Sequence, residues 1–148
     1  FLYHPDIRTK LNSYMHRGVT LPKPQGYDMI SENFPKDGVC LTKQITTGVP
    51  QEGMSKSLVF DPRINLIYET GAHRSKTPVG SFSESVEFKV LHYKNLSLSY
   101  KMDRIKALSS RRSEYDKEFG HNMHWSVSDE EIKAGFQQEL AASIAVIE

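Results

Sequence analysis

The segment Val86-Glu87-Phe88-Lys89-Val90-Leu91-His92-Tyr93 decides the fold class of this 148-residue chain. Its first residues alternate between apolar and charged side chains, which is the period of a half-buried β-strand. Its end is apolar on both sides, as is typical of a strand that enters the interior of a sheet. We therefore predict a strand over residues 86–93, followed by the polar Lys94.

Helical patterns lie on both sides of this strand. Apolar residues at helical spacing predict one helix from about Ser97 to Arg112 and another from Pro5 to Arg17, where the proline suits the first turn. Ser128-Asp129-Glu130-Glu131 is a capping box, in which the serine hydroxyl and a glutamate carboxylate satisfy exposed amides. It opens a final helix, whose apolar stripe comprises Ile132, Phe136, Leu140, Ile144 and Ile147.

Shorter β-like runs fill the first half of the chain. Two strands are expected on either side of Pro22, Pro24 and Gly26, and two more on either side of the turn Asp61-Pro62-Arg63. These four runs are Val19–Leu21, Tyr27–Ile30, Ser57–Phe60 and Ile64–Tyr68. Strands mixed with helices predict an α/β fold, and the length fits a single domain over residues 1–148.

The charge balance bears on the partners of the chain. Nineteen Lys and Arg residues against 18 Asp and Glu give a net charge of +1. Such a chain has no overall field that attracts nucleic acid or an anionic membrane, so any anionic ligand must be held by local groups. No run approaches the roughly 20 apolar residues of a membrane span, and we expect no transmembrane segment.

Cys40 is the single cysteine of the chain. It has no second thiol for an internal disulfide or a zinc cluster, which favours a reducing compartment and a cytoplasmic location. Its neighbours Val39 and Leu41 predict a small buried hydrophobic residue rather than a nucleophile.

Histidines are the first candidates for chemistry. His73 and His92 each lie where a strand region meets a polar loop, and either is a metal ligand or a core imidazole held by one backbone bond. His121 and His124 also have a spacing that suits a metal, although no carboxylate lies beside them. A histidine-metal hydrolase that uses these four side chains is therefore one open alternative.

Four basic residues lie within reach of these sites and are sufficient to neutralise a diphosphate. They are Lys56, Arg74, Lys76 and Lys94. No phosphate-cradling P-loop, dinucleotide-binding glycine fingerprint, Gly-x-Ser-x-Gly elbow or His-Glu-x-x-His motif occurs in the sequence. Several large enzyme classes thereby lose support.

An ordered series of motifs resembles a bacterial branch of the family-2 glycosyltransferases. The series comprises Phe1-Leu2-Tyr3-His4-Pro5, Lys23-Pro24-x-Gly26-Tyr27-x-Met29-x-Ser31-Glu32-x-Phe34-Pro35, Lys56-x-x-Val59-Phe60-Asp61-Pro62, Gly71-x-His73 and Leu91-His92-Tyr93-Lys94. It continues with Tyr100, Arg104, Arg112-Ser113 and Gly120 to Trp125. The resemblance covers roughly residues 1 to 125, and the order of the motifs makes it specific.

This resemblance implies a GT-A fold, whose amino-terminal nucleotide-binding half ends in an Asp-x-Asp-Glu-Phe type strand that holds a divalent metal, manganese or magnesium. Phe1 resembles the phenylalanine of that motif, and no Asp-x-Asp occurs within the chain. We therefore expect the carboxyl-terminal, acceptor-side part of such an enzyme, with a partial GT-A-like mixed sheet and the metal-binding acids just ahead of Phe1.

The resemblance also implies roles for individual residues. His92 matches the position of a metal-ligating histidine best, and His73 is second. Lys56 and Lys94 would stabilise the departing diphosphate, and Arg74 and Tyr93 are further substrate-binding candidates. Glu32 is the candidate for the carboxylate that deprotonates the acceptor hydroxyl.

The implied function is transfer of a sugar from a nucleotide-sugar donor to a glycan acceptor, during assembly of a surface polysaccharide. The alternative is a non-catalytic remnant that binds carbohydrate and does not turn over. Without an amino-terminal half the chain would expose a sheet edge and apolar surface, so we also expect self-association into a homo-oligomer.

Overall fold

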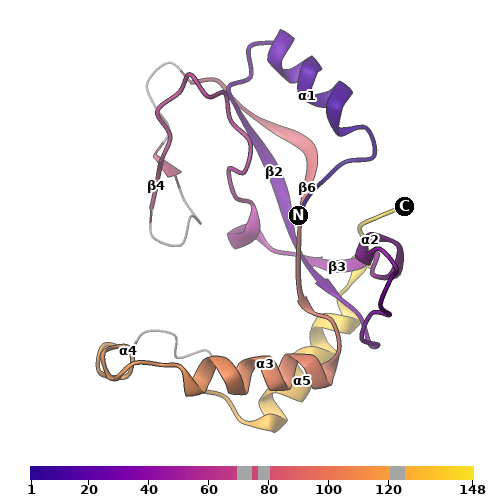
Figure 1. The fold of residues 1–148 in the computed structure, drawn as a ribbon, viewed down its shortest axis with the longest axis vertical. Coiled ribbons are helices and arrows are strands. Elements are labelled where there is room, and N and C mark those ends of the chain that lie inside the picture. The colour runs from indigo at the N-terminus through magenta and orange to yellow at the C-terminus, as the bar shows by residue number, and fades with distance from the viewer. Residues whose placement is uncertain (70–74, 77–80, 121–125) are drawn as a thin grey trace. The chain divides into compact units, whose positions relative to one another are not determined.

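The computed structural model describes residues 1–69, 75–76, 81–120 and 126–148, which form strands and helices of an α/β fold (Figure 1). In chain order the elements are β1 (Leu2–Tyr3), α1 (Ile7–His16), β2 (Leu21–Ile30), α2 (Leu41–Gln44), β3 (Thr47–Pro50), the 3-10 helix η1 (Glu52–Met54), β4 (Ile67–Tyr68), β5 (Ser75–Lys76), β6 (Ser83–Asn95), α3 (Leu98–Ser110), α4 (Glu114–Glu118), α5 (Asp129–Ala141) and β7 (Ile144–Ala145). The predicted α/β class is confirmed.

Among the described residues, the main sheet has the strand order β1-β6-β2-β3-β7, and β4 pairs with β5 apart from it. β1 is antiparallel to β6, and β3 is antiparallel to β7. β2 and β6 run in the same direction, since the Thr20 amide donates to the Phe82 carbonyl near their starts and the Ser31 amide donates to the Asn95 carbonyl at their ends. The sheet is therefore mixed, as expected.

The chain divides into two compact units. Unit 1 comprises Phe1–Asp28 and Pro50–His92, and unit 2 comprises Met29–Val49 and Tyr93–Glu148. β2 and β6 each begin in unit 1 and end in unit 2.

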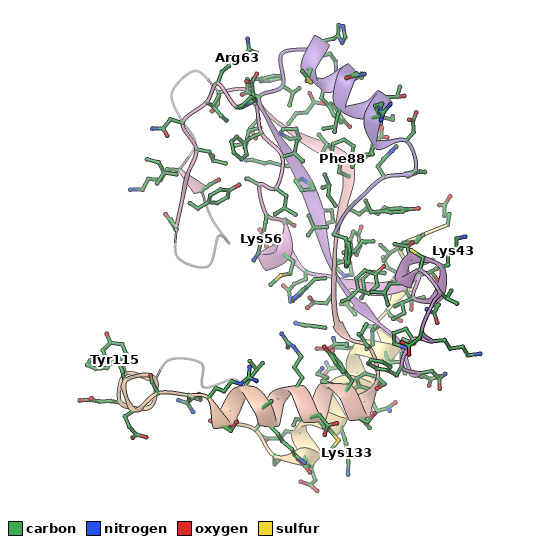
Figure 2. All side chains as sticks on the ribbon, viewed as in Figure 1. Lys43, Lys56, Arg63, Phe88, Tyr115 and Lys133 are labelled. Carbon is green, nitrogen blue, oxygen red and sulfur yellow. The ribbon has the colours of Figure 1, made fainter. Side chains whose placement is uncertain are left out.

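The core of unit 1 lies between α1 and β6. Tyr14, Val19 and Phe88 are buried there, and the rings of Tyr14 and Phe88 meet edge to face with centroids 5.4 Å apart. Figure 2 shows Phe88 next to α1. The helix predicted between Pro5 and Arg17 is thus confirmed as α1, and its buried face covers the sheet.

Unit 2 contains α3 and α5, which lie side by side (Figure 1). The Ser97 hydroxyl accepts from the Tyr100 amide and caps α3, so the helix predicted from about Ser97 is confirmed. The capping box at Ser128 is also confirmed, with both of its reciprocal bonds to Glu131 present. α5 buries Phe136 almost completely.

The two strands predicted on either side of Pro22 and Pro24 form one continuous strand, β2, so this prediction was wrong. A proline is tolerated in a strand where its missing N–H faces an unpaired edge. β3 reaches β2 only from Gly26 onward, where the Gln51 amide donates to the Gly26 carbonyl. The prolines therefore precede the part of β2 that β3 pairs with.

The hairpin predicted between Ser57–Phe60 and Ile64–Tyr68 is also absent from the described residues. Of the predicted strand Ile64–Tyr68, only Ile67–Tyr68 forms a strand, β4. This strand pairs with Ser75–Lys76 of β5. The Asp61 carboxylate accepts from both the amide and the guanidinium of Arg63. This local turn is closed by side-chain bonds, so it does not require a β-ladder between its flanks.

Two further expectations were wrong. α5 ends at Ala141, and Ile144 lies in β7, where it pairs with Gly48 of β3 rather than extending the helical stripe. Cys40 is exposed at the start of α2, because this four-residue helix buries none of its side chains.

Among the described residues, no helix has the length and apolar character needed to cross a membrane.

Candidate functional site

His92 lies beside the buried carboxylate of Asp28 within unit 1. The His92 Nδ1 atom is 2.8 Å from Asp28 Oδ1. Asp28 has a side-chain exposure of 6%, whereas the His92 side chain is 38% exposed. An ionised carboxylate only accepts hydrogen bonds, so with Asp28 ionised Nδ1 would carry the hydrogen and Nε2 the lone pair. The partly exposed imidazole could then bind a metal ion through Nε2.

Neighbouring strands bring these two residues together. Asp28 is on β2 and His92 is on β6, and the two strands are adjacent in the sheet. Met29 and Leu91, which flank the pair in sequence, are 0% and 1% exposed. The buried neighbours fix the strands, and the carboxylate and the ring meet at a defined place.

The segment that carries Lys56 is held against β2 at Gly26. The Gly26 amide donates to Ser55 Oγ at 2.9 Å, and a Cβ atom at Gly26 would lie 2.6 Å from the Ser55 amide nitrogen. Only glycine leaves room for this approach. Residues 26 and 28 point to the same face of a strand, so the segment ending in Lys56 covers the face toward which Asp28 points. Figure 2 shows Lys56 next to η1.

Glu32 belongs to a different feature, an open hollow of about 430 Å³ within unit 2. The residues around it include Glu32, Asn33, Gln44, Thr46, Thr47 and Leu140. The Gln44 amide group is engaged by the preceding loop, since it donates to the Lys36 and Val39 carbonyls. Glu32 is exposed and supplies the carboxylate of this hollow.

The other predicted site residues are distributed as follows. Tyr93 and Lys94 are half-buried near the end of β6 and belong to unit 2. Lys76 is exposed on β5. His73, Arg74, His121 and His124 lie outside the described residues. The structure therefore brings His92 to Asp28 within unit 1, and it brings the segment ending in Lys56 to Gly26, two residues earlier on β2.

Asp28 is the residue that sequence reasoning missed. It stands in the run Tyr27-Asp28-Met29-Ile30, where it is the one charged side chain of a predicted strand. A buried charge requires a partner, so an acid in an apolar run was the available signal. The sequence does not indicate which cation or ring the partner is.

A second histidine–carboxylate pair in unit 1 differs from the first. His4 Nε2 is 3.3 Å from Glu87 Oε2, and 60% of the Glu87 side chain is exposed. The same oxygen lies 2.7 Å from Lys10 Nζ. The bond from Lys10, followed by that from His4, lowers the pKa of the Glu87 carboxyl group. This is a surface ion pair that holds α1 to β6.

Within the parts of the chain that the structure describes, no three His, Cys, Asp or Glu side chains gather as a metal site. At the site beside Asp28 the described residues therefore supply the imidazole of His92 rather than a complete ligand shell.

No family model, curated protein or solved structure matches this chain.

Proposed function

We propose that this chain is the acceptor-side part of a metal-dependent glycosyltransferase, which transfers a sugar from a nucleotide-sugar donor to a glycan acceptor. The observation that carries the proposal is the Asp28–His92 pair, with Nδ1 bonded to a buried carboxylate and the ring exposed. Histidines that bind metals almost always donate their other ring N–H to a carboxylate, a carbonyl or water. His92 has the chemistry of such a ligand for manganese or magnesium.

Both ions prefer oxygen ligands, so carboxylates would have to complete the shell. The β1–β6 ladder supports a source for one of them. The Phe1 amino group donates to the Leu91 carbonyl at 2.9 Å, and the Leu91 amide donates back to Phe1 at 2.7 Å. In a longer chain, the same antiparallel register would put the residue before Phe1 opposite His92, with both side chains on one face.

That position corresponds to the glutamate in the Asp-x-Asp-Glu-Phe pattern that Phe1 resembles. An acid there and the imidazole of His92 would face each other across the ladder.

The remaining roles follow from charge and position. A bound divalent metal would neutralise charge on the diphosphate of the donor. Lys56, on the face of β2 toward which Asp28 points, would stabilise the departing diphosphate, and Lys94 would add to this effect. Arg74 and Tyr93 would contact the substrate, and His73 would be a second candidate ligand.

Glu32 would act on the acceptor. The hollow of about 430 Å³ beside it falls within the range of about 300–1,000 Å³ for small-molecule sites. In an inverting transfer Glu32 would take the proton from an acceptor hydroxyl while that oxygen attacks the anomeric carbon. The bond from this carbon to the diphosphate oxygen breaks, and its electron pair leaves with the nucleoside diphosphate.

A nucleotide-sugar donor and a single cysteine fit a cytoplasmic location. Self-association remains part of the proposal, since Leu58, Ile67 and Phe82 of unit 1 are exposed apolar side chains. A strictly monomeric chain in light scattering would count against this part alone.

The proposal is tested by titrating the chain with Mn²⁺ and a uridine diphosphate sugar in a calorimeter. We expect metal-dependent binding that is lost in His92→Ala and kept in His16→Ala, an exposed histidine whose Nδ1 bonds only within α1. Absence of Mn²⁺-dependent binding by the wild-type chain contradicts the proposal, and metal-independent glycan binding favours the carbohydrate-binding remnant.

A separate pair of variants tests the hydrolase alternative. Loss of metal binding in His121→Ala and His124→Ala, with retention in His92→Ala, would favour a histidine-metal hydrolase. The glycosyltransferase proposal expects the larger loss at His92.

A further inference from the structure

We infer that Asp28 is a positioning residue, which fixes the tautomer and ring orientation of His92 so that Nε2 is presented to a metal ion. This inference rests on the proposed function and deepens it. The two residues are joined by the 2.8 Å contact between His92 Nδ1 and Asp28 Oδ1.

The burial of Asp28 makes the position of its carboxylate well defined. The residue is 5% exposed, and the next residue, Met29, is 0% exposed. β2 is flanked by β6 on one side and β3 on the other. A buried ionised carboxylate needs hydrogen bonds, and the bond to His92 is one that holds this carboxylate in place.

The exposed ring of His92 requires such support. A histidine side chain rotates between rotamers and exchanges tautomers when nothing holds Nδ1. A carboxylate at Nδ1 selects the tautomer with hydrogen on Nδ1 and raises the ligand basicity of the other nitrogen. Asp28 would thus act through His92 without touching the metal.

The His4–Glu87 pair provides a matched contrast within unit 1. That contact is longer at 3.3 Å and uses Nε2, and its carboxylate is 60% exposed. Glu87 also binds Lys10, so its charge is shared. Removing the Glu87 charge should therefore leave His92 unaffected.

Replacing Asp28 with asparagine changes the chemistry with little change in shape. The new amide N–H can donate to Nδ1, and Nε2 then carries the hydrogen. A protonated Nε2 has no lone pair for a metal ion. Asp28→Ala removes the carboxylate beside His92 Nδ1, so this carboxylate no longer selects the tautomer of the ring.

The test is ¹⁵N NMR of the histidine side chains at a pH where the imidazoles are neutral. We expect His92 in the wild-type chain to carry its hydrogen on Nδ1, and Asp28→Asn to shift it toward the Nε2–H tautomer. Glu87→Gln should leave the His92 tautomer as in the wild type. Mn²⁺ should broaden the His92 resonances, and Asp28→Asn should weaken this binding roughly 10- to 100-fold.

The inference is overturned if wild-type His92 carries its hydrogen on Nε2, or if a folded Asp28→Asn variant keeps the wild-type tautomer. Circular dichroism establishes folding, and the wild-type tautomer decides the matter alone if the variant does not fold. If the wild-type tautomer is as inferred but Mn²⁺ broadens no His92 resonance, the proposed function fails and the positioning of His92 by Asp28 stands.

Discussion

The side-chain amide of Asn95 donates to the carboxylate of Glu139 at 2.8 Å, which joins the last residue of β6 to α5. Lys101 Nζ of α3 donates to the same carboxylate oxygen at 2.7 Å. Asn95 is 1% exposed. One acid of unit 2 therefore satisfies a buried amide and pairs with a cation of a second helix.

Removal of this acid should destabilise the fold. Glu139→Ala leaves the Asn95 amide buried without this acceptor, and we expect the free energy of unfolding to fall by about 1–3 kcal/mol. Glu139→Gln keeps an acceptor for Asn95 and loses the charge, so its effect should be smaller. Urea denaturation measures both, with exposed Gln138→Ala as the control. Equal midpoints for Glu139→Ala and Gln138→Ala would contradict this role.

Gly26 should be intolerant of any side chain. A Cβ atom there would lie 2.6 Å from the Ser55 amide nitrogen and 2.7 Å from the Gln51 carbonyl oxygen, both of them backbone atoms. Overpacking of this kind costs about 1–3 kcal/mol, so Gly26→Ala should lower the thermal midpoint. Gly53→Ala is the control, because its nearest neighbour would be the end of the Gln51 side chain at 3.8 Å. If both variants melt at the temperature of the wild type, η1 does not approach β2 as closely as these distances require.

The turn at Asp61 should contribute stability that depends on pH. Hydrogen bonds from the Arg63 side chain and backbone lower the pKa of the Asp61 carboxyl from 3.8 to about 2. Because the pKa is lower in the folded state, this contribution is complete above the unfolded value and is lost as the pH falls from 3.8 toward about 2. Carbon-detected NMR titration measures the pKa, and Arg63→Ala should raise it. An unchanged pKa in that variant would argue against the pairing.

Local patterns in the sequence predicted the elements whose stabilising contacts are local. α3 and the capping box of α5 depend on residues within one or two turns, and both are present. The continuity of β2 and the pairing of Ile144 with Gly48 depend on partners far along the chain. Short windows of sequence carry no information on such partners, and these predictions were wrong.

The candidate site shows the same difference between local patterns, which the sequence predicts, and contacts between distant residues, which it does not. His92 was identified from its place at the end of a predicted strand. Its partner Asp28 lies 64 residues earlier, and the two meet because β2 and β6 are neighbours in the sheet. A parallel pairing of strands cannot be read from spacing. The glycine at position 26 belongs to a quoted motif, yet only the approach of η1 explains why it must be glycine.

Cys40, expected to be buried, should instead react readily. Its Sγ atom lies 3.1 Å from Thr42 Oγ1. Hydrogen bonds from the side chain and backbone of Thr42, aided by the charge of Lys43, lower the pKa of the Cys40 thiol. A lower pKa gives a larger thiolate fraction at neutral pH, and the thiolate is the nucleophile.

Iodoacetamide should therefore label Cys40 in the native chain, with a rate that rises below the pH range of an ordinary thiol. Thr42→Val removes the strongest of these bonds and should move the rate profile to higher pH. Thr46→Val, the same change at a threonine that does not contribute to the lowered pKa of the thiol, serves as the control, and mass spectrometry follows the labelling. Overlapping profiles for Thr42→Val and the wild type would show that the Thr42 hydroxyl does not stabilise the thiolate.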